Sequence, residues 1–264
     1  YLFRFYIFIL GLNSIKKMSK NEEIVCLFDV DGTLTESRKK ISDEMHKFML
    51  QLTKKVVVGL VGGSDLEKIK EQMGGERCMT DFDYVFAENG LVAYKGGELI
   101  YVQSFLKHYG EEKSQEIINF CLEYMSKLTL PCKRGTFIEY RNGLINVCPV
   151  GRSCSQEERT QFNKYDQEHL IRKKFAEAVE EKFSAYDLQC TIGGEISFDV
   201  FPIGWDKRCC LQHLDMTKIK EIHFFGDKVH KGGNDHEIYT DERVIGHQVA
   251  NPNDTMEQLR CLFF

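Results

Sequence analysis

The spacing of apolar residues predicts buried strands alternating with helices in the first part of the chain and near its end. Ile24–Asp29, Val56–Val61 and Glu221–Gly226 are short, mostly apolar runs, typical of strands covered on both faces of a parallel sheet. After the first run, Ser42 precedes apolar residues at helical spacing over positions 45–52. The order strand, helix, strand predicts an α/β domain whose ligands bind at the carboxyl ends of the strands.

The middle of the chain has a different texture. A long amphipathic helix is expected near Glu111–Leu128, and a charged helical region over Gln156–Phe183. Hairpin-like strands surround these helices, which predicts an α+β module with an antiparallel sheet. The four strands are expected at residues 136–140, 144–147, 188–192 and 196–201.

The return of the α/β texture after residue 205 indicates that the middle module is inserted into the first domain. A strand over residues 244–249 and a helix from Asp254 complete that domain. The predicted architecture is an α/β core with a parallel sheet, formed by residues 18–100 and 206–264. An α+β cap domain with an antiparallel sheet, residues 101–205, interrupts it.

Composition excludes several classes of protein. The net charge is −5 and no long basic run occurs, so nucleic acid is not an expected partner. The ten cysteines form no Cys-x-x-Cys pair, which excludes a zinc ribbon and indicates a reducing, cytoplasmic location. Tyr1–Leu10 is about half as long as the ~20 apolar residues of a membrane span, so no membrane anchor is expected. Residues 1–17 are expected to be an upstream or non-native extension before Met18.

Two aspartates follow the first predicted strand. Asp29 and Asp31 lie two positions apart, so both side chains can point to the same edge of the sheet. One carboxylate could attack phosphorus while the other protonates the leaving oxygen and deprotonates the next acceptor. Gly32 permits a tight turn after the pair. The alternative is a solvated acidic turn without chemistry.

The segment Asp29-Val-Asp-Gly-Thr33 resembles the Asp-x-Asp-x-Thr signature of the haloacid dehalogenase (HAD) superfamily, whose core has a Rossmann-like parallel sheet. The resemblance implies that Asp29 is the nucleophile and Asp31 the general acid/base. It also implies a phosphate-binding hydroxyl at Ser64, in Val61-Gly-Gly-Ser-Asp65, at the start of a helix. Lys207, in Gly204-Trp-Asp-Lys207, would offset charge on Asp29 and the phosphoryl group.

The acidic loop Gly226-Asp-Lys-Val-His-Lys-Gly-Gly-Asn-Asp235 resembles the metal-binding signature of the same superfamily. Mg²⁺ prefers carboxylates, carbonyls and phosphate oxygens. The expected ligands are Asp29, the backbone carbonyl of Asp31, and Asp227. Asn234 and Asp235 are expected either to bind the ion or to orient its ligands.

Arginines in the inserted module suggest a second phosphate site. Arg141, Arg152 and Arg159 lie near strand ends and a helix start, and guanidinium groups bind phosphate bidentately. Two phosphate sites suit a mutase acting on a sugar bisphosphate, whereas a phosphatase needs only one. For any single arginine, the alternative is a solvated surface position.

Segments that include Gly151-Arg-Ser-Cys-Ser-Gln-Glu-Glu-Arg159 and Gly193-Gly-Glu-Ile-Ser-Phe-Asp-Val-Phe-Pro202 resemble the eukaryotic phosphomannomutase family. The resemblance implies that Arg38 joins the three cap arginines in holding the nontransferring phosphate and the sugar. It further implies a homodimer formed through the caps, closure of the cap over substrate, and sugar contacts from Ser197 and Asp199. A second ion site would involve Tyr239 and Asp241, although Val244 stands where a threonine is expected.

These features predict interconversion of mannose 6-phosphate and mannose 1-phosphate, feeding GDP-mannose synthesis. The expected cofactors are Mg²⁺ and a hexose 1,6-bisphosphate activator, glucose or mannose 1,6-bisphosphate. The nearest alternative is a sugar-phosphate phosphatase of the same superfamily, which would pass the phosphoryl group to water. A noncatalytic sugar-phosphate or metal-binding protein with the same fold is a third hypothesis. The sequence leaves the preference between mannose and glucose phosphates open.

Overall fold

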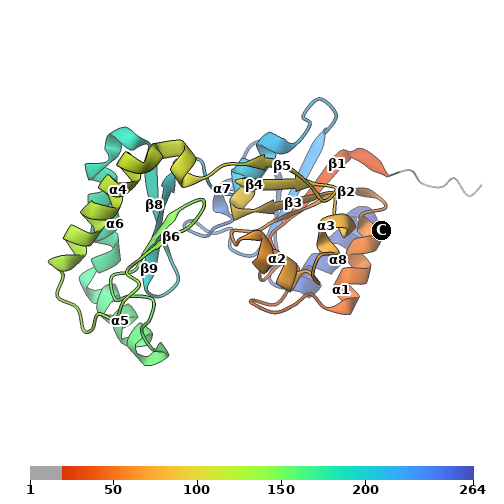
Figure 1. Cartoon of the computed structure of the whole chain (residues 1–264). Helices are drawn as coiled ribbons and strands as arrows, with labels where there is room; N and C mark the ends of the chain where they lie inside the picture. Colours follow the sequence, from red (N-terminus) through yellow and green to blue (C-terminus); the bar gives the residue numbers. More distant parts are fainter. Residues whose placement is uncertain (1–19) are drawn as a thin grey trace, which may run out of the picture.

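The computed structural model describes residues 20–264 as two units, each built on its own sheet (Figure 1). The prediction for residues 1–17 lies outside the described part. Among the described residues, no helix is both long and apolar enough to cross a membrane.

The larger unit contains a seven-stranded sheet in the order β11-β10-β1-β2-β3-β4-β5. The five strands from β11 to β3 are parallel, and β4 and β5 continue the sheet in antiparallel pairing. The strands are β1 (Asn21–Phe28), β2 (Val56–Val61), β3 (Tyr84–Ala87), β4 (Val92–Lys95), β5 (Glu98–Val102), β10 (Glu221–Gly226) and β11 (Ile245–Gln248). The predicted parallel sheet is confirmed, with an additional hairpin at one edge.

Helices cover both faces of this sheet because its central strands are apolar on both sides. Cys26 and Phe28 pack against the helices of one face, whereas Val25 and Leu27 face the other. On the first face lie α1 (Asp43–Leu52), α2 (Leu66–Gln72), α3 (Cys78–Asp81) and α8 (Pro252–Phe263); on the second lie α7 (His236–Tyr239) and the 3₁₀ helix η3 (Lys207–His213). A further 3₁₀ turn, η1 (Glu88–Gly90), follows β3.

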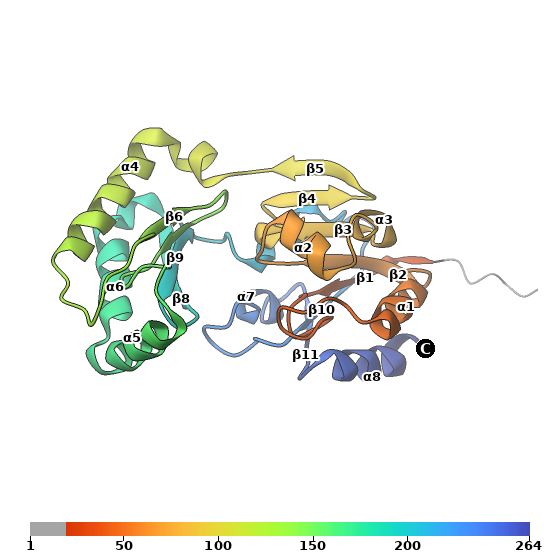
Figure 2. The same cartoon turned by 60° about the horizontal axis from the view of Figure 1, so that its bottom comes forward.

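The smaller unit has a four-stranded antiparallel sheet in the order β6-β7-β9-β8, as predicted. Its strands are β6 (Ile138–Tyr140), β7 (Ile145–Val147), β8 (Leu188–Gly193) and β9 (Ser197–Pro202). The helices are α4 (Phe105–Ser126), α5 (Gln156–His169) and α6 (Ile171–Lys182), with the short 3₁₀ turn η2 (Ser184–Tyr186). Figure 2 shows α4 and α6 on the side of this sheet that faces away from the larger unit.

Backbone conformation sets two helix boundaries in the smaller unit. Gly110, whose φ is 77°, separates a first turn at Phe105 from the long part of α4, so the helix predicted near Glu111–Leu128 is confirmed. The charged region is two helices, because Leu170 takes a left-handed conformation with φ 56°. A single residue with positive φ interrupts a helix without altering the pattern of apolar side chains around it.

One face of the small sheet is polar and turned toward the larger unit. Val147, Phe198 and Val200 pack against the helices, so the alternate residues point the other way. Glu139, Asn146 and Asp199 are neighbours across β6, β7 and β9 on that polar face. Ser197 and Asp199, two of the predicted substrate residues of the cap, are therefore carried by the face that is turned toward the larger unit.

The chain passes from the larger unit to the smaller one after β5 and returns after β9. Next to the first connection, the amide of Asn142 donates to the carbonyl of Gln103 at 3.0 Å. Phe105 N–H donates to the carbonyl of Asn142 at 2.6 Å. Strand β5 runs to Val102, slightly past the predicted border at residue 100, and the proposed division at residues 101 and 205 stays a prediction.

Candidate active site

The acidic pair lies where the carboxyl ends of three parallel strands meet. Asp29 follows β1, which pairs with β10 on one side and with β2 on the other. Asp227 follows β10, and Ser64 lies beyond the end of β2. Parallel strands bring these loops together at one edge of the sheet, although the residues are far apart in the sequence.

Three carboxylates and one ammonium group form the centre of this edge. Oxygen atoms of Asp29, Asp227 and Asp235 lie within 4.8 Å of one another. Lys207 is fully buried and donates from Nζ to Asp29 Oδ1 and, at 2.5 Å, to Asp235 Oδ1. Three negative charges and one positive charge leave an excess of two negative charges, so a divalent cation would neutralise the cluster.

Asp227 has the properties of a direct metal ligand. Its Oδ1 is buried and has no hydrogen-bond partner among the described residues. By contrast, Asp235 uses both oxygens within the protein, since Oδ2 accepts from Lys228 N–H at 3.0 Å. These contacts favour Asp227 as a ligand and Asp235 as the group that positions Lys207. The donor set fits the oxygen preference of Mg²⁺.

Burial and like charges shift the acid–base properties of the cluster. Burial, together with the carboxylates of Asp235 and Asp227, raises the pKa of Asp29 to about 7 against the lowering effect of Lys207. Burial would lower the pKa of Lys207, but attraction to Asp235 and Asp29 outweighs it and the pKa is raised. Lys207 therefore remains a cation. The nucleophile is on the margin of protonation unless further positive charge is supplied.

Gly32 is required by the closeness of the two acidic loops. Its φ is 84°, and a Cβ built on it would lie 2.4 Å from Oδ2 of Asp227. A side chain at this position would both strain the backbone and displace a predicted metal ligand. The turn that the sequence suggested thus has a second role, which is to admit Asp227.

Asp31 is oriented by two donors on one of its oxygens. Its Oδ1 accepts from the backbone N–H of Arg38 and from Nε2 of Gln72, each at 2.7 Å. Its Oδ2 has no hydrogen-bond partner among the described residues, so it is available for proton transfer. Arg38 itself is exposed, with φ 62°. Gln72 was missed from the sequence, because nothing local connects an α2 glutamine with Asp31.

Two cavities meet at the loop after β2. A cavity of about 120 Å³ is lined by Asp29, Asp31, Ser64, Gln72, Lys228 and Asn234, among others. A larger cavity of about 670 Å³ lies between the two units and shares Gly63 and Ser64 with it. Ser64 thus faces both spaces. Ser64 lies just before the start of α2, as predicted, and the helix itself is capped by Asp65, whose side chain accepts from Lys68 N–H.

The cap contributes a chain of polar contacts opposite this loop. Arg141 lines the larger cavity with Glu139, which it contacts through Nε at 2.8 Å and through Nη2. Arg152 lies 3.4 Å from the same Glu139 oxygen and donates to Oδ1 of Asn146 at 2.8 Å. The structure therefore brings Arg141 and Arg152 together around a carboxylate that the sequence did not single out.

Asn146 links this arginine pair to the predicted sugar contacts. Its Nδ2 donates to Asp199 Oδ1 at 2.7 Å and to Ser197 Oγ at 3.1 Å. Burial raises the pKa of Asp199, while the hydrogen bond from Asn146 lowers it. Arg159 joins the group more loosely, donating to the carbonyl of Arg152 at 3.3 Å. Asn146 gave one signal in the sequence, a polar residue between apolar strand positions.

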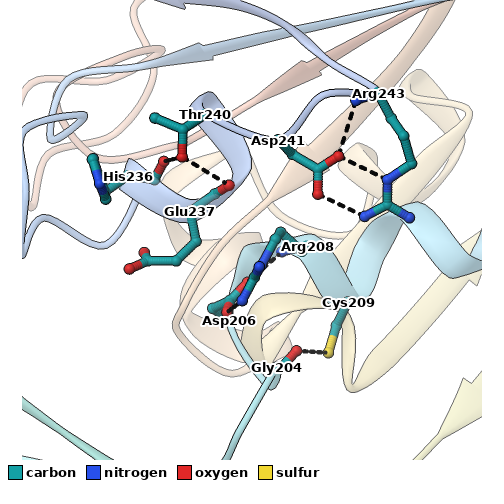
Figure 3. A network of polar contacts seen from close by, with 9 residues as sticks. All are labelled: Gly204, Asp206, Arg208, Cys209, His236, Glu237, Thr240, Asp241 and Arg243. Carbon is teal, nitrogen blue, oxygen red and sulfur yellow. Dashed lines mark hydrogen bonds and ion pairs between the residues drawn. The ribbon is translucent and has the colours of Figure 1, made fainter.

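The residues predicted for a second ion lie apart from both cavities. Asp241 accepts from Nε and Nη2 of Arg243, each at 2.7 Å, and Asp206 is paired with Arg208 nearby (Figure 3). Tyr239, at the end of α7, packs beside Gly246. A guanidinium group already neutralises the Asp241 carboxylate, so a cation there would compete with Arg243.

The fold belongs to a recognisable class. It is similar to an IMP-bound IMP-nucleotidase of Plasmodium falciparum, with a TM-score of 0.60 and 18% identity over 90% of this chain and 68% of that one. It is also similar to a haloacid dehalogenase-like hydrolase from Bacteroides thetaiotaomicron, with a TM-score of 0.54 and 13% identity over 83% and 85% of the two chains. The Rossmann-like core and the inserted cap therefore form a HAD-like fold.

Sequence comparison identifies the family within this class. The profile of eukaryotic phosphomannomutase matches residues 45–264. A phosphomannomutase of Galdieria sulphuraria is 54% identical over 96% of this chain and 99% of its own length. One of Glycine max is 58% identical over 91% and 96% of the two chains. The chain belongs to the eukaryotic phosphomannomutase family.

Proposed function

We propose that this protein interconverts mannose 6-phosphate and mannose 1-phosphate through a phosphorylated Asp29 and a hexose 1,6-bisphosphate. Family membership sets the substrate class, hexose phosphates. One structural observation supports a mutase in particular. A cavity of about 670 Å³ is lined by Arg141 on its cap side and adjoins the Asp29 cavity on its core side. A sugar bisphosphate could therefore be held through one phosphate while the other reacts.

In the first transfer, an oxygen of Asp29 attacks the phosphorus of a hexose 1,6-bisphosphate. The bond between phosphorus and the sugar oxygen breaks, and Asp31 protonates the leaving oxygen. In the second transfer, Asp31 takes the proton of a hydroxyl of the bound monophosphate, and that oxygen attacks the phosphorus of the aspartyl phosphate. The bond between phosphorus and the Asp29 oxygen breaks, which restores the Asp29 carboxylate and gives a hexose bisphosphate. Ser64 and Lys207 lie beside Asp29, where they suit the phosphoryl oxygens.

We propose Mg²⁺ as the metal, held by Asp29, Asp227 and the backbone carbonyl of Asp31. When bound, it supplies positive charge that reduces repulsion between an anionic carboxylate and an anionic phosphoryl group. Asp235 and Asn234 are assigned to orienting this centre. Asp235 has the support of its contact with Lys207.

The cap residues hold the end of the sugar that does not react. Arg141, Arg152 and Arg159, with Arg38 from the core, are proposed to bind the nontransferring phosphate, and Ser197 and Asp199 the sugar hydroxyls. After the bisphosphate has formed, it must turn so that its other phosphate meets Asp29. Water must be excluded during this step, because an aspartyl phosphate hydrolyses readily.

The decisive assay follows the fate of the phosphoryl group. Mannose 1-phosphate is incubated with Mg²⁺ and a catalytic amount of glucose 1,6-bisphosphate, and products are followed by phosphorus NMR. We expect mannose 6-phosphate without stoichiometric inorganic phosphate. Release of one phosphate per sugar would instead establish a sugar-phosphate phosphatase. Repeating the assay with glucose 1-phosphate measures the preference between the two sugars.

Three further points belong to the same proposal. Residues 18–100 and 206–264 are assigned to the core and residues 101–205 to the cap. Two copies are proposed to associate through their caps, which sedimentation of the full chain would test. A cytoplasmic location, supplying mannose 1-phosphate for GDP-mannose synthesis, remains a prediction.

A further inference from the structure

We propose that Glu139 is an anionic placeholder: its carboxylate occupies the arginine groups of the cap and exchanges with the phosphate of the substrate. The inference rests on the proposed function and adds a residue to it. In this role Glu139 does not contact the reacting atoms. It sets how tightly the cap holds a phosphate and how easily it releases one.

The geometry at Arg141 carries the proposal. Glu139 Oε2 accepts from both Nε and Nη2 of Arg141, which is the edge of a guanidinium group that clamps phosphate bidentately. The same oxygen is 3.4 Å from Nε of Arg152. One carboxylate oxygen thus takes two donors from Arg141 and forms an ion pair with Arg152. A phosphate can use these donors only if Glu139 gives them up.

The surroundings allow such an exchange. The Glu139 side chain is 39% exposed and lines the larger cavity beside Arg141, so a ligand can reach both. Arg152 does not depend on Glu139 for its orientation, because its Nη1 donates to the buried Asn146. Arg152 would therefore stay near its position when the carboxylate moves away, and Arg141 would be free to turn to the phosphate.

A competing carboxylate has a use in the proposed reaction. The bisphosphate must release one phosphate from the cap, turn, and present the other. Arginines without competition would bind either phosphate tightly and slow this turn. Glu139 would replace the departing phosphate, so that the guanidinium groups are not left without a counter-charge.

The test compares the wild type with Glu139→Gln, which keeps the size of the side chain and removes its charge. Binding of mannose 6-phosphate is measured by calorimetry with Mg²⁺ and without a bisphosphate, so that no turnover occurs. We expect roughly three- to tenfold tighter binding, since a partly exposed charged competitor has been removed. In the mutase assay KM should fall and kcat should fall with it.

Three variants complete the design. Glu123→Gln removes a carboxylate from an exposed ion pair with Lys127 on the cap helix α4, and should leave binding unchanged. In an Arg141→Met background, the gain from Glu139→Gln should shrink. Glu139→Asp keeps the charge but shortens its reach, so affinity should lie between those of the wild type and Glu139→Gln.

The direction in which the affinity for mannose 6-phosphate changes decides whether Glu139 competes with the phosphate or orients Arg141. Weaker binding in Glu139→Gln, with an unaltered melting temperature, would overturn the placeholder and show instead that Glu139 orients Arg141. Unchanged binding would overturn the placeholder as well, because Glu139 would then not compete with the phosphate. If the glutamine variant does not fold, Glu139→Asp is used instead: tighter binding than the wild type supports the placeholder, and weaker or unchanged binding overturns it. Failure of the proposed function is recognised separately, because it shows as absent turnover in the wild type.

Discussion

At the scale of single residues, the candidate active site depends on the Asp29 carboxyl group, whose neighbours have opposing effects on its charge. Asp29 is buried among other acids, which favours its neutral form, and it contacts Lys207, which favours the anion. A nucleophile must be ionised, so the balance of these forces matters for activity. Additional positive charge from a metal would move the balance toward the anion.

Replacing the nucleophile should abolish chemistry while leaving the fold in place. Asp29→Asn retains the shape of the side chain but cannot form an aspartyl phosphate, and we expect turnover to fall by at least about a thousandfold. Mass spectrometry after incubation with glucose 1,6-bisphosphate should detect a phosphate on Asp29 only in the wild type. The matched control is Asp187→Asn, at an exposed left-handed position where asparagine is well tolerated. Full activity of Asp29→Asn would contradict the mechanism.

The pKa of Asp29 also predicts how metal affinity depends on pH. In the metal-free protein the carboxyl has a pKa of about 7, so it is mostly protonated at pH 6 and mostly ionised at pH 8. A proton and a cation compete for this group, and the apparent affinity for Mg²⁺ should be about tenfold weaker at pH 6 than at pH 8. Titrating activity with Mg²⁺ at each pH measures the shift. An affinity independent of pH would show that Asp29 does not bind the ion.

At the scale of elements, the cap sheet carries its function on one face and its stability on the other. Val147, Phe198 and Val200 anchor β7 and β9 to the helices, and the alternate positions present polar groups. Asn146 contributes to both stability and function. It is buried, and it forms hydrogen bonds with three proposed substrate residues: Arg152, Ser197 and Asp199.

Removing the Asn146 amide should therefore affect both stability and binding. In Asn146→Ala, the buried partners lose their hydrogen bonds, and the free energy of unfolding should fall by about 1–3 kcal/mol. KM for mannose 6-phosphate should rise more than kcat falls, since the reacting groups lie in the other domain. Urea unfolding and steady-state kinetics measure the two effects. Asn163→Ala on α5, whose side chain has no hydrogen bond among the described residues, is the control.

At the scale of the whole molecule, the polar face of the cap sheet lies opposite the carboxyl-end edge of the core sheet across the larger cavity, and the chain connects the two units twice (Figure 2). The contacts beside the first connection include the hydrogen bond from Asn142 to the carbonyl of Gln103. A ligand that binds arginines on one side and the Asp29 loop on the other would draw the units together.

Closure of the cap can be followed in solution. The radius of gyration from small-angle X-ray scattering should decrease when mannose 6-phosphate and Mg²⁺ are added together, because the ligand contacts both units. Arg141→Ala should weaken this response, since it removes a contact on the cap side. The same radius with and without ligand would contradict a moving cap.

Much of the fold could be predicted because its signals are local. Apolar runs mark β1, β2 and β10, and the cap of α1 at Ser42 is confirmed by its hydrogen bond to Met45 N–H. The hairpin of β4 and β5 was missed, since its exposed Leu99 and Ile100 do not alternate with polar residues. The helix break at Leu170 was missed because backbone conformation leaves little trace in the apolar pattern.

The sequence by itself determined the chemistry and the class of this protein. The acidic pair, the lysine and the acidic loop each lie within one short stretch of sequence. Each motif can therefore be recognised without knowing how the chain folds. Only the tertiary structure decided which groups meet. Gln72 holding Asp31, Glu139 between two arginines, and Arg243 on Asp241 are contacts between side chains that folding brings together, or orients toward each other, in three dimensions. The contact of Gln72 depends on the packing of α2 beside the end of β1. Glu139 and Asp241 are each two residues from an arginine partner, and the local backbone direction decides whether the two side chains meet.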